Sequence, residues 1–573
     1  MPCCWCILKN VSSKEPERIV PGSISFTASV SLACLAIVAA LLGGCGGNEA
    51  GSPQAAVEIG GPSGTELAAD QTLHVGNGTG PQTLDPHRAE GVPSANILRD
   101  LFEGLTIEAP DGSIVPGVAK SWDISADGLV YTFHLHDDAK WSNGDPLTAE
   151  DFVFSLRRST DPATMSHYSS ILEPIVNAME VITGEKSPEE LGVEALDALT
   201  LVIRLQRPTA YLLGLLTHST TYPVHRASVG QYGNQFAREG RLIGNGAYTL
   251  DEWVVQSHIK LIRNKFYRDN AATTIDSVYY YSIENQDAEL KRFRADELDI
   301  TEEIPYQQLP WIRENLADQL VISPYLGSYY FGFNMTREPF KNNLQLRRAL
   351  SLAIDRDIIT SRITNAGEIP AYGWVPQMAG YKQVASEWAG WTQAERNAEA
   401  QRLYSEAGYS IDKPLKIELL YNTSANHKRL SVAIASMWKQ TLGVETKLLN
   451  QEWKVFLATR KLMKITQIFR AGWIGDYNDV FTFAQLMHSA NEMNHSGYSS
   501  SRYDELIERA ADETDLQARA DFLNQAEHVL LEDMPIIPIY FYVSKHLIKS
   551  WVGGRQPNIM DHHYTKNFYI LQH

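Results

Sequence analysis

The sequence has little cysteine and places all of it at one end. Only five of the 573 residues are cysteine, and Cys45 is the last of them. A stretch without cysteine cannot form disulfide bonds within itself, so everything after Cys45 must be stable through its size and packing. This excludes the small, disulfide-stapled class of exported domains.

Positive charge is also scarce. Lys and Arg number 50 against 68 Asp and Glu, which gives a net charge of −18. Because an acidic chain is repelled by phosphate-rich surfaces, we expect no nucleic-acid binding and no charge-driven binding to anionic lipid. The hydrophobic content of 44% and charged content of 21% are those of an ordinary soluble globular protein.

Motifs of catalysis and metal binding are missing as well. The sequence has no His-Glu-x-x-His, no Gly-x-Ser-x-Gly and no glycine-rich phosphate loop. Ser436 and Lys439 have the Ser-x-x-Lys spacing of serine acyl enzymes, but the companion motifs are absent and the pair lies in an amphipathic helical segment. We therefore expect no enzyme and no cofactor.

Histidine pairs do not predict a metal site either. His134 and His136 alternate with apolar residues and are interpreted as the solvent face of a hairpin. In an extended segment His562 and His563 point to opposite faces, so they do not bind one ion together.

The N-terminal region has the layout of an export signal. An uncharged apolar run, Ile24 to Leu42, follows several basic residues. Leu42-Gly43-Gly44-Cys45 resembles a bacterial lipobox, which predicts a signal peptide over 1–44 and a lipidated Cys45. The alternative is a retained transmembrane helix, since about 20 apolar residues can cross a bilayer. The segment before Ile24 is long for an n-region, so the true translation start stays open.

The rest of the chain divides into a tether and a large body. Residues 45–71 are rich in Gly, Ser, Pro and Ala and predict a flexible tether. The body that follows is longer than one hydrophobic core usually serves, so we expect at least two lobes.

Strand and helix signals alternate through this body. Asp127-Gly128 between alternating runs predicts a hairpin. Thr148 with Asp151, and Thr392 with Glu395, predict helix starts. Residues 415–421 and 444–449 read as strands around a helix that stops at Gly443, so this βαβ unit predicts a parallel pair and an α/β class.

One short segment favours ligand binding. Residues 470–478 hold Arg470, Trp473 and Asp476 between glycines that permit close backbone approach. A secluded Asp476 would seek a cation such as a ligand amine, and Trp473 offers a flat apolar wall. The alternative is a surface turn with a structural Arg–Asp pair.

This segment resembles the ligand-amine motif of the periplasmic oligopeptide-binding proteins, the family 5 substrate-binding subunits of peptide ABC importers. The resemblance runs from Thr72 to His573. It includes the stretches Leu84-Asp85-Pro86-His87, Arg99-Asp100-Leu101-Phe102-Glu103-Gly104-Leu105, Asn245-Gly246-Ala247-Tyr248, Asn450-Gln451-Glu452-Trp453-Lys454 and Trp551-Val552-Gly553-Gly554.

The resemblance implies an α/β fold of two lobes that close about a hinge, with an additional inserted domain. On this chain, lobe I would combine 72–102, 226–298 and 544–573. The inserted domain II would be 103–225, and lobe III would be 299–543.

The resemblance also implies the binding residues. Asp476 would pair with the peptide α-ammonium, and cationic groups at His427, Arg470, Arg337 and Arg460 would meet the C-terminal carboxylate. Backbone groups around Val92, Gly472 and Ile474 would hold the peptide main chain. Trp453, Trp473 and Tyr168 would form pocket walls, while Glu90 and His218 would line side-chain pockets. Arg470 as a structural holder of the Asp476 loop stays open.

The implied partners are short peptides and the membrane permease of an ABC transporter, with the protein expected to be a periplasmic monomer. Relatives that bind murein tripeptide, dipeptides, haem or nickel leave the ligand open. A peptide sensor or folding helper is a further alternative. Binding by charged termini and backbone predicts capture of peptides largely independent of their sequence.

Overall fold

The computed structural model describes residues 66–464 and 466–573. The predicted signal peptide, Cys45 and most of the predicted tether lie outside the described residues. Among the described helices, none combines the length and the apolar character that a membrane crossing requires.

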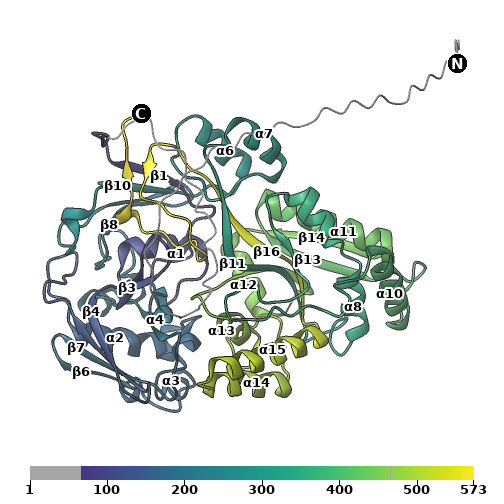
Figure 1. The fold of residues 1–573 in the computed structure, drawn as a ribbon, viewed down its shortest axis with the longest axis horizontal. Helices are drawn as coiled ribbons and strands as arrows, with labels where there is room; N and C mark the ends of the chain where they lie inside the picture. Colours follow the sequence, from purple (N-terminus) through teal and green to yellow (C-terminus); the bar gives the residue numbers. More distant parts are fainter. Residues whose placement is uncertain (1–65, 465) are drawn as a thin grey trace, which may run out of the picture. The chain divides into compact units, whose positions relative to one another are not determined.

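Three larger sheets organise the described residues (Figure 1). The first has the order β1 (Thr72–Gly76), β10 (Ser277–Tyr281), β9 (His258–Arg263) and β8 (Tyr248–Val254). The second has the order β4 (Ala119–Ile124), β5 (Val130–Leu135), β7 (Thr200–Arg204) and β6 (Val193–Asp197). The third has the order β12 (Ile369–Pro370), β16 (Ile536–Leu547), β11 (Leu320–Phe333), β15 (Ile468–Ile474), β13 (Lys416–Asn422) and β14 (Glu445–Gln451).

Two short pairs and the helices complete the elements. The pairs are β2 (Thr106–Glu108) with β3 (Ile114–Pro116), and β17 (Val552–Gly553) with β18 (Tyr569–Ile570). The helices are α1 (Val92–Leu101), α2 (Ala149–Thr160), α3 (Ala178–Ile182), α4 (Leu212–Leu215), α5 (Arg226–Tyr232), α6 (Gln286–Arg294), α7 (Leu309–Asn315), α8 (Leu344–Leu352), α9 (Arg356–Ile358), α10 (Gln393–Glu406), α11 (Ala425–Leu442), α12 (Trp453–Leu462), α13 (Phe481–Ala484), α14 (Ser501–Asp512) and α15 (Leu516–Asp533).

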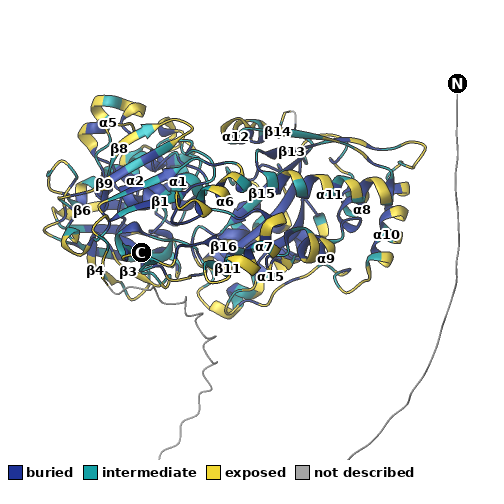
Figure 2. Cartoon of the chain, turned by 90° about the horizontal axis from the view of Figure 1, so that it is seen from above, coloured by how far each residue is buried: buried dark blue, intermediate teal, exposed yellow. Residues whose placement is uncertain are grey.

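The third sheet carries a core on each face. Because side chains alternate along a strand, Tyr329 and Phe331 of β11 pack with α8, α10 and α11, while Tyr330 packs on the opposite face. In β15, Ile468 joins the first core, and Phe469 and Ala471 join the second. Figure 2 shows exposed residues gathered on outer helix faces such as those of α5 and α10.

The longest strand pair of this sheet is interrupted. Strands β11 and β16 run side by side and antiparallel (Figure 1), with partners from Leu320↔Leu547 to Pro324↔Val543 and again from Ser328↔Phe541 onward. The register shifts between Pro324 and Ser328. The interruption leaves Tyr325 and Leu326 outside the regular pairing.

The local sequence predictions are confirmed. Gly128 has φ +70° in the turn between β4 and β5, and capping boxes start α2 at Thr148 and α10 at Thr392. Strands β13 and β14 pair in parallel around α11, which ends before Gly443 at φ +78°. That helix begins at Ala425, several residues before the periodic apolar stretch, because Ser424 caps its first turn.

The Ser436–Lys439 pair and His134, which the sequence did not favour as catalytic or metal-binding residues, lie at the protein surface or in a hairpin contact. Ser436 and Lys439 are exposed on α11, and His134 pairs with Asp123 across the β4–β5 hairpin at 2.8 Å. In the part of the chain that the structure describes, no group of three or more His, Cys, Asp or Glu residues is arranged to hold a metal ion.

Candidate functional site

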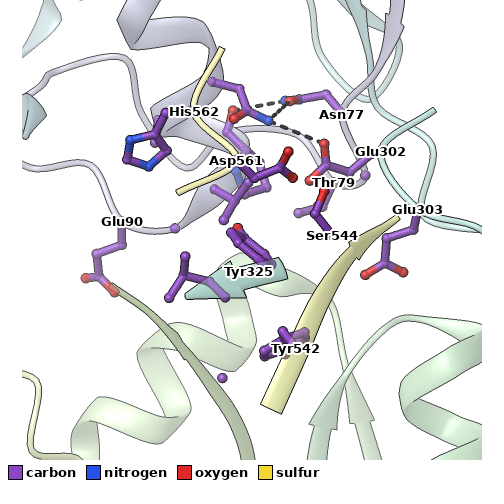
Figure 3. A pocket seen from close by; sticks show the side chains of 18 of the residues that line it. Asn77, Thr79, Glu90, Glu302, Glu303, Tyr325, Tyr542, Ser544, Asp561 and His562 are labelled. Atoms are coloured by element: carbon purple, nitrogen blue, oxygen red, sulfur yellow. Dashed lines mark hydrogen bonds between the residues drawn. The ribbon is translucent and has the colours of Figure 1, made fainter. Parts of the chain in front are cut away.

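A cavity of about 370 Å³ lies where several sequence-distant segments meet. It is lined from β1 and α1, from the loops at 168 and 217–219, and from residues 300–303. Further lining comes from β11, from 422–427 at the start of α11, from α12, from β15 with the loop after it, from β16, and from the C-terminal segment 555–568. Figure 3 shows part of this lining, including Glu90, Glu302, Tyr325 and Asp561.

The structure brings together all but one of the predicted binding residues. The lining includes Glu90, Val92, Tyr168, His218, His427, Trp453, Arg460, Arg470, Gly472, Trp473, Ile474 and Asp476. Arg337 is the exception, because it follows the outer end of β11, is exposed, and donates a hydrogen bond to the carbonyl of Lys464.

Asp476 is held in a loop directly after β15. Its amide donates to Thr482 Oγ1 at 3.1 Å, and the Thr482 hydroxyl donates to Asp476 Oδ2 at 3.4 Å. Gly475, the residue before it, donates its amide to the carbonyl of Leu326. These bonds hold the loop backbone in place, and among the described residues only the Thr482 hydroxyl donates to the carboxyl group.

The electrostatics leave this carboxyl without a cation. His218 Nε2 is 3.7 Å from Asp476 Oδ1, but burial and the nearby His562 and Arg99 lower the pKa of His218 to about 3. The imidazole is therefore neutral and the contact is not an ion pair. Burial raises the pKa of Asp476 to about 8, against the Thr482 hydrogen bond, which lowers it.

Aromatic rings line the wall beside this carboxyl. Tyr168 stacks with Trp473, their ring centroids 6.3 Å apart, and lies against His218 at 5.0 Å. Trp473 Nε1 donates to Thr482 Oγ1 at 3.3 Å, so one hydroxyl positions both Trp473 and Asp476. The polar edge of Trp473 is therefore already hydrogen-bonded, which fixes the position of its ring in the wall.

Two buried guanidinium groups enter the same cavity. Arg460 on α12 is 8% exposed and lies over the Phe456 ring at 5.4 Å. Within the described residues it has no carboxylate within 4 Å, and its Nε lacks a hydrogen-bond partner. Arg470 on β15 donates to Tyr542 Oη at 2.8 Å and to Asn422 Oδ1 at 3.3 Å, which are neutral groups.

His427 has a different charge from the one expected. It lies at the start of α11, 3.5 Å from Tyr329 Oη, and is 8% exposed. Burial and the nearby Arg470 and Lys545 hold its pKa well below the ordinary value. His427 therefore offers the cavity a neutral imidazole.

Close backbone approach occurs at two glycines. A Cβ on Gly472 would lie 2.6 Å from Tyr542 Oη, and one on Gly91, at φ +79°, would lie 2.9 Å from Trp453 Cζ2. Both glycines let a cavity-lining aromatic ring pack against the main chain. Glu90, next to Gly91, is 3.4 Å from His167 Nε2, and burial raises its pKa.

Sequence reasoning missed one end of the cavity. Glu302, Glu303, Tyr325, Ser544 and Asp561 line it, and Figure 3 shows their side chains around a common space. Asp561 accepts from His546 Nε2 at 2.7 Å and from Arg555 at 2.9 Å. These residues have no common motif, so the only available signal was two consecutive glutamates after a strand-like stretch.

The match to protein families decides what kind of protein this is. The profile described as bacterial extracellular solute-binding proteins, family 5 Middle, matches residues 113–495, more than half of the chain. The chain belongs to this family.

Other family 5 solute-binding proteins match along most of the length. The periplasmic oligopeptide-binding protein OppA of Escherichia coli (strain K12) is 42% identical over 550 residues, covering 95% of this chain and 99% of that protein. The structure of the Escherichia coli murein tripeptide binding protein MppA gives a TM-score of 0.87 at 40% identity, covering 89% of this chain and 100% of that one. Haemophilus influenzae OppA in complex with RPPGFSPFR gives 0.86 at 37% identity, covering 88% and 100%. The expected two-lobed α/β binding-protein fold is confirmed.

A second MppA structure, in another arrangement of the same fold, is less similar to this chain. The unliganded open form of MppA gives a TM-score of only 0.63 at the same 40% identity, covering 89% of this chain and 99% of that one. The described residues are therefore arranged unlike that open form.

Proposed function

We propose that this family 5 protein captures short peptides, largely independent of their sequence, and delivers them to an ABC importer. The observation that carries the proposal is the set of unpaired buried charges in one cavity. Asp476 has no cation partner and Arg460 has no carboxylate partner among the described residues. A peptide with free termini supplies one ammonium and one carboxylate, which is the complement of this set.

The residue roles form part of the proposal. Asp476 pairs with the α-ammonium, and Arg460 and Arg470 meet the C-terminal carboxylate, with His427 as a neutral neighbour. Backbone groups of Val92, Gly472 and Ile474 hold the peptide main chain, which is common to all peptides and so gives affinity without selecting sequence. Trp453, Trp473 and Tyr168 form walls, while Glu90 and His218 border side-chain pockets.

Calorimetry with trialanine and its blocked forms tests this function. Trialanine is expected to bind, while its N-acetyl and C-amide forms bind more weakly, because each leaves one buried charge without a partner. Equal affinity for all three forms would contradict the assignment. Mass spectrometry of the peptides after prolonged incubation tests the further expectation that the protein releases them uncleaved.

Murein tripeptide is the second candidate ligand, favoured by the likeness to MppA. Competition between murein tripeptide and a defined linear tripeptide separates the two. A peptide sensor or folding helper would use the same cavity, and peptide uptake that persists in a deletion strain would support that role over import.

The domain division belongs to this proposal. Lobe I would contain the β1–β10–β9–β8 sheet, the inserted domain II the β4–β5–β7–β6 sheet, and lobe III most of the six-stranded sheet. The boundary at 543/544 falls inside β16, so this strand would pass from one lobe to the other.

The cellular setting is proposed from the family and from the N-terminal sequence. We infer a periplasmic monomer, tethered to a membrane through lipidated Cys45 near its permease. Fractionation of cells that carry Cys45→Ala tests the anchor. The variant is expected to move from the membrane fraction to the soluble periplasmic fraction.

A further inference from the structure

The missed end of the cavity carries an excess of acid. Glu302 and Glu303 both line it, and Figure 3 shows the two carboxylates at the same end, on either side of Ser544 in this view. Among the described residues, neither has a Lys, Arg or His nitrogen within the 4.0 Å that defines a salt bridge. The hydrogen bonds to these carboxylates come from the side-chain amides of Asn and Gln residues.

The hydrogen bonds to these carboxylates can be named. Glu302 accepts from Asn96 Nδ2 at 3.4 Å, and Glu303 accepts from Gln286 Nε2 at 2.8 Å and from Asn426 Nδ2 at 3.4 Å. None of these donors carries a positive charge. The two acids are therefore positioned by hydrogen bonds but not neutralised.

Three nearby basic side chains contact other carboxylates, while Arg99 has no carboxylate within 4.0 Å among the described residues. Lys545 pairs with Glu368 at 3.1 Å, and His546 and Arg555 pair with Asp561 at 2.7 and 2.9 Å. Arg99 donates to Asn96 Oδ1 at 2.8 Å. These pairs leave Glu302 and Glu303 as acids with no ion-pair partner of their own.

Independently, the same end of the cavity contains a hydroxyl group that lacks a hydrogen-bond partner among the described residues. Ser544 on β16 is 3% exposed, lines the cavity, and its Oγ has no hydrogen-bond partner among the described residues. Buried polar atoms are nearly always satisfied, so an unsatisfied one beside two carboxylates indicates a missing polar ligand group. A ligand N–H group would satisfy it.

Aromatic walls complete the shape. Tyr325 and Tyr542 both line the cavity and pack edge to face with ring centroids 6.1 Å apart. Tyrosine rings pack against an aliphatic stem and attract a cation at their faces. Such walls suit a side chain that is long and apolar except for a positive end.

We propose that Glu302, Glu303 and Ser544 form a second cation subsite, which binds the ammonium or guanidinium group of a ligand Lys or Arg side chain. The proposal rests on the proposed peptide-binding function and specifies its ligand class: peptides with a basic side chain. The subsite is separate from Asp476, which takes the α-ammonium. Burial also raises the pKa of Glu302 to about 7, and an ion-pair partner would relieve this cost.

Matched peptides test the subsite without altering the protein. Calorimetry compares alanine tripeptides that carry lysine or its uncharged isostere norleucine at the first, second or third position. At one position the lysine peptide is expected to bind at least about tenfold more tightly, as for a desolvated charge pair. Lysine and norleucine peptides within about threefold of each other at all three positions would overturn the subsite.

A double variant assigns the preference to these residues. In Glu302→Gln/Glu303→Gln the ratio of norleucine to lysine dissociation constants is expected to fall to within about threefold of unity, because the amides keep the shape and remove the charge. Glu314→Gln, at an exposed position on α7, is the control and keeps the wild-type ratio. A ratio that survives the double variant would overturn the assignment. If no tripeptide binds the wild-type protein at all, the proposed function itself fails.

Discussion

Asp476 and Arg460 are single residues whose surroundings make sense only with a ligand in place. Each is buried, each is positioned by packing or neutral hydrogen bonds, and neither has an oppositely charged partner among the described residues. Burying an unpaired charge costs several kcal/mol, on the order of the penalty for breaking a buried ion pair. Protonation avoids this cost at Asp476, whose pKa burial raises to about 8, and a ligand group of opposite charge would offset it at both residues.

Replacement of Asp476 is the simplest test of its proposed pairing with the ligand α-ammonium. Asp476→Asn is expected to weaken trialanine binding by about 2–5 kcal/mol, because the buried α-ammonium loses its partner. Binding of N-acetyl-trialanine, which lacks that ammonium, should change much less. Asp137→Asn, at an exposed position, is the control. A loss smaller than threefold for trialanine would contradict the role.

The raised pKa of Asp476 predicts that peptide binding is linked to protons. In the ligand-free cavity the carboxyl is largely protonated below its pKa of about 8, with His218, Thr482 and Tyr168 around it. Pairing with an α-ammonium requires the ionised form, so binding releases a proton and affinity rises as the pH goes from about 6 to 7.5.

Calorimetry of trialanine in two buffers with different ionisation enthalpies measures this proton release. Asp476→Asn should lose both the proton release and the rise in affinity. Proton release that is unchanged in the variant would assign the linkage to another group.

At the scale of elements, strand β15 shows how a glycine shapes the site. Gly472 pairs with Tyr329 in the ladder to β11, and the Tyr542 hydroxyl occupies the space that a side chain on Gly472 would need. Tyr542 in turn accepts the hydrogen bond from Arg470. Because Gly472 has no side chain, Tyr542 can lie against β15 and accept the hydrogen bond that positions the Arg470 guanidinium group.

Gly472→Ala is accordingly expected to weaken peptide binding about tenfold or more, because Tyr542 and Arg470 must shift. Gly443→Ala is the matched control. At φ +78° its new Cβ is strained, which costs about 1 kcal/mol of stability and lowers the melting temperature, but the residue lies outside the cavity lining. Calorimetry and thermal unfolding of both variants separate the two effects. Equal binding by Gly472→Ala and wild type would contradict the argument.

Elements with local signals were the predictable part of the fold. The Asp127-Gly128 turn, the capping boxes at Thr148 and Thr392 and the parallel pair around α11 depend on neighbours within a few residues, so their sequences specify them. The family resemblance supplied most of the candidate site. It placed Arg337 in that set, whereas the structure has this residue exposed at the outer end of β11.

The acidic end of the cavity could not be predicted in the same way. Glu302, Ser544 and Asp561 become neighbours of one space only through sheet pairing and the return of the C-terminal segment. Their charges are also set by tertiary contacts, since Asp561 is neutralised by Arg555 and Glu302 is not. Local sequence does not contain that distinction.

For the whole molecule, a set of contacts joins segments that pack in different cores. Ile171 and Leu172 belong to the core around α2, whereas Tyr168, just before them, and Met493 pack against the core around α12 and α14. Ser169 Oγ donates to Glu492, and His167 contacts both Lys461 and Glu90. The described arrangement differs from the open MppA form, so we expect these contacts to hold the closed one.

Loss of these contacts is expected to speed ligand release. Ser169→Ala or Glu492→Gln should raise the peptide dissociation rate about threefold to tenfold, as for the loss of one ordinary hydrogen bond, with little effect on association. Stopped-flow displacement of a fluorescent tripeptide measures both rates. The double variant serves as the control: it should dissociate no faster than the worse single variant, because both changes remove one interaction. Additive effects would contradict a direct contact.

The interruption between Pro324 and Ser328 has a consequence for how the binding site is built. The amide of Leu326 donates to the carbonyl of Ile559, and its own carbonyl accepts from Gly475, each at 2.8 Å. The bond to Gly475 continues the register of β11 with β15, whereas the Leu326 amide turns away from the sheet to Ile559. The two bonds anchor the loop of Asp476 on one side and the segment of Asp561 on the other. Leu326, in the stretch of β11 that does not pair with β16, thus fixes the Asp476 loop relative to the opposite wall, and through that spacing we expect it to limit the length of ligand that fits.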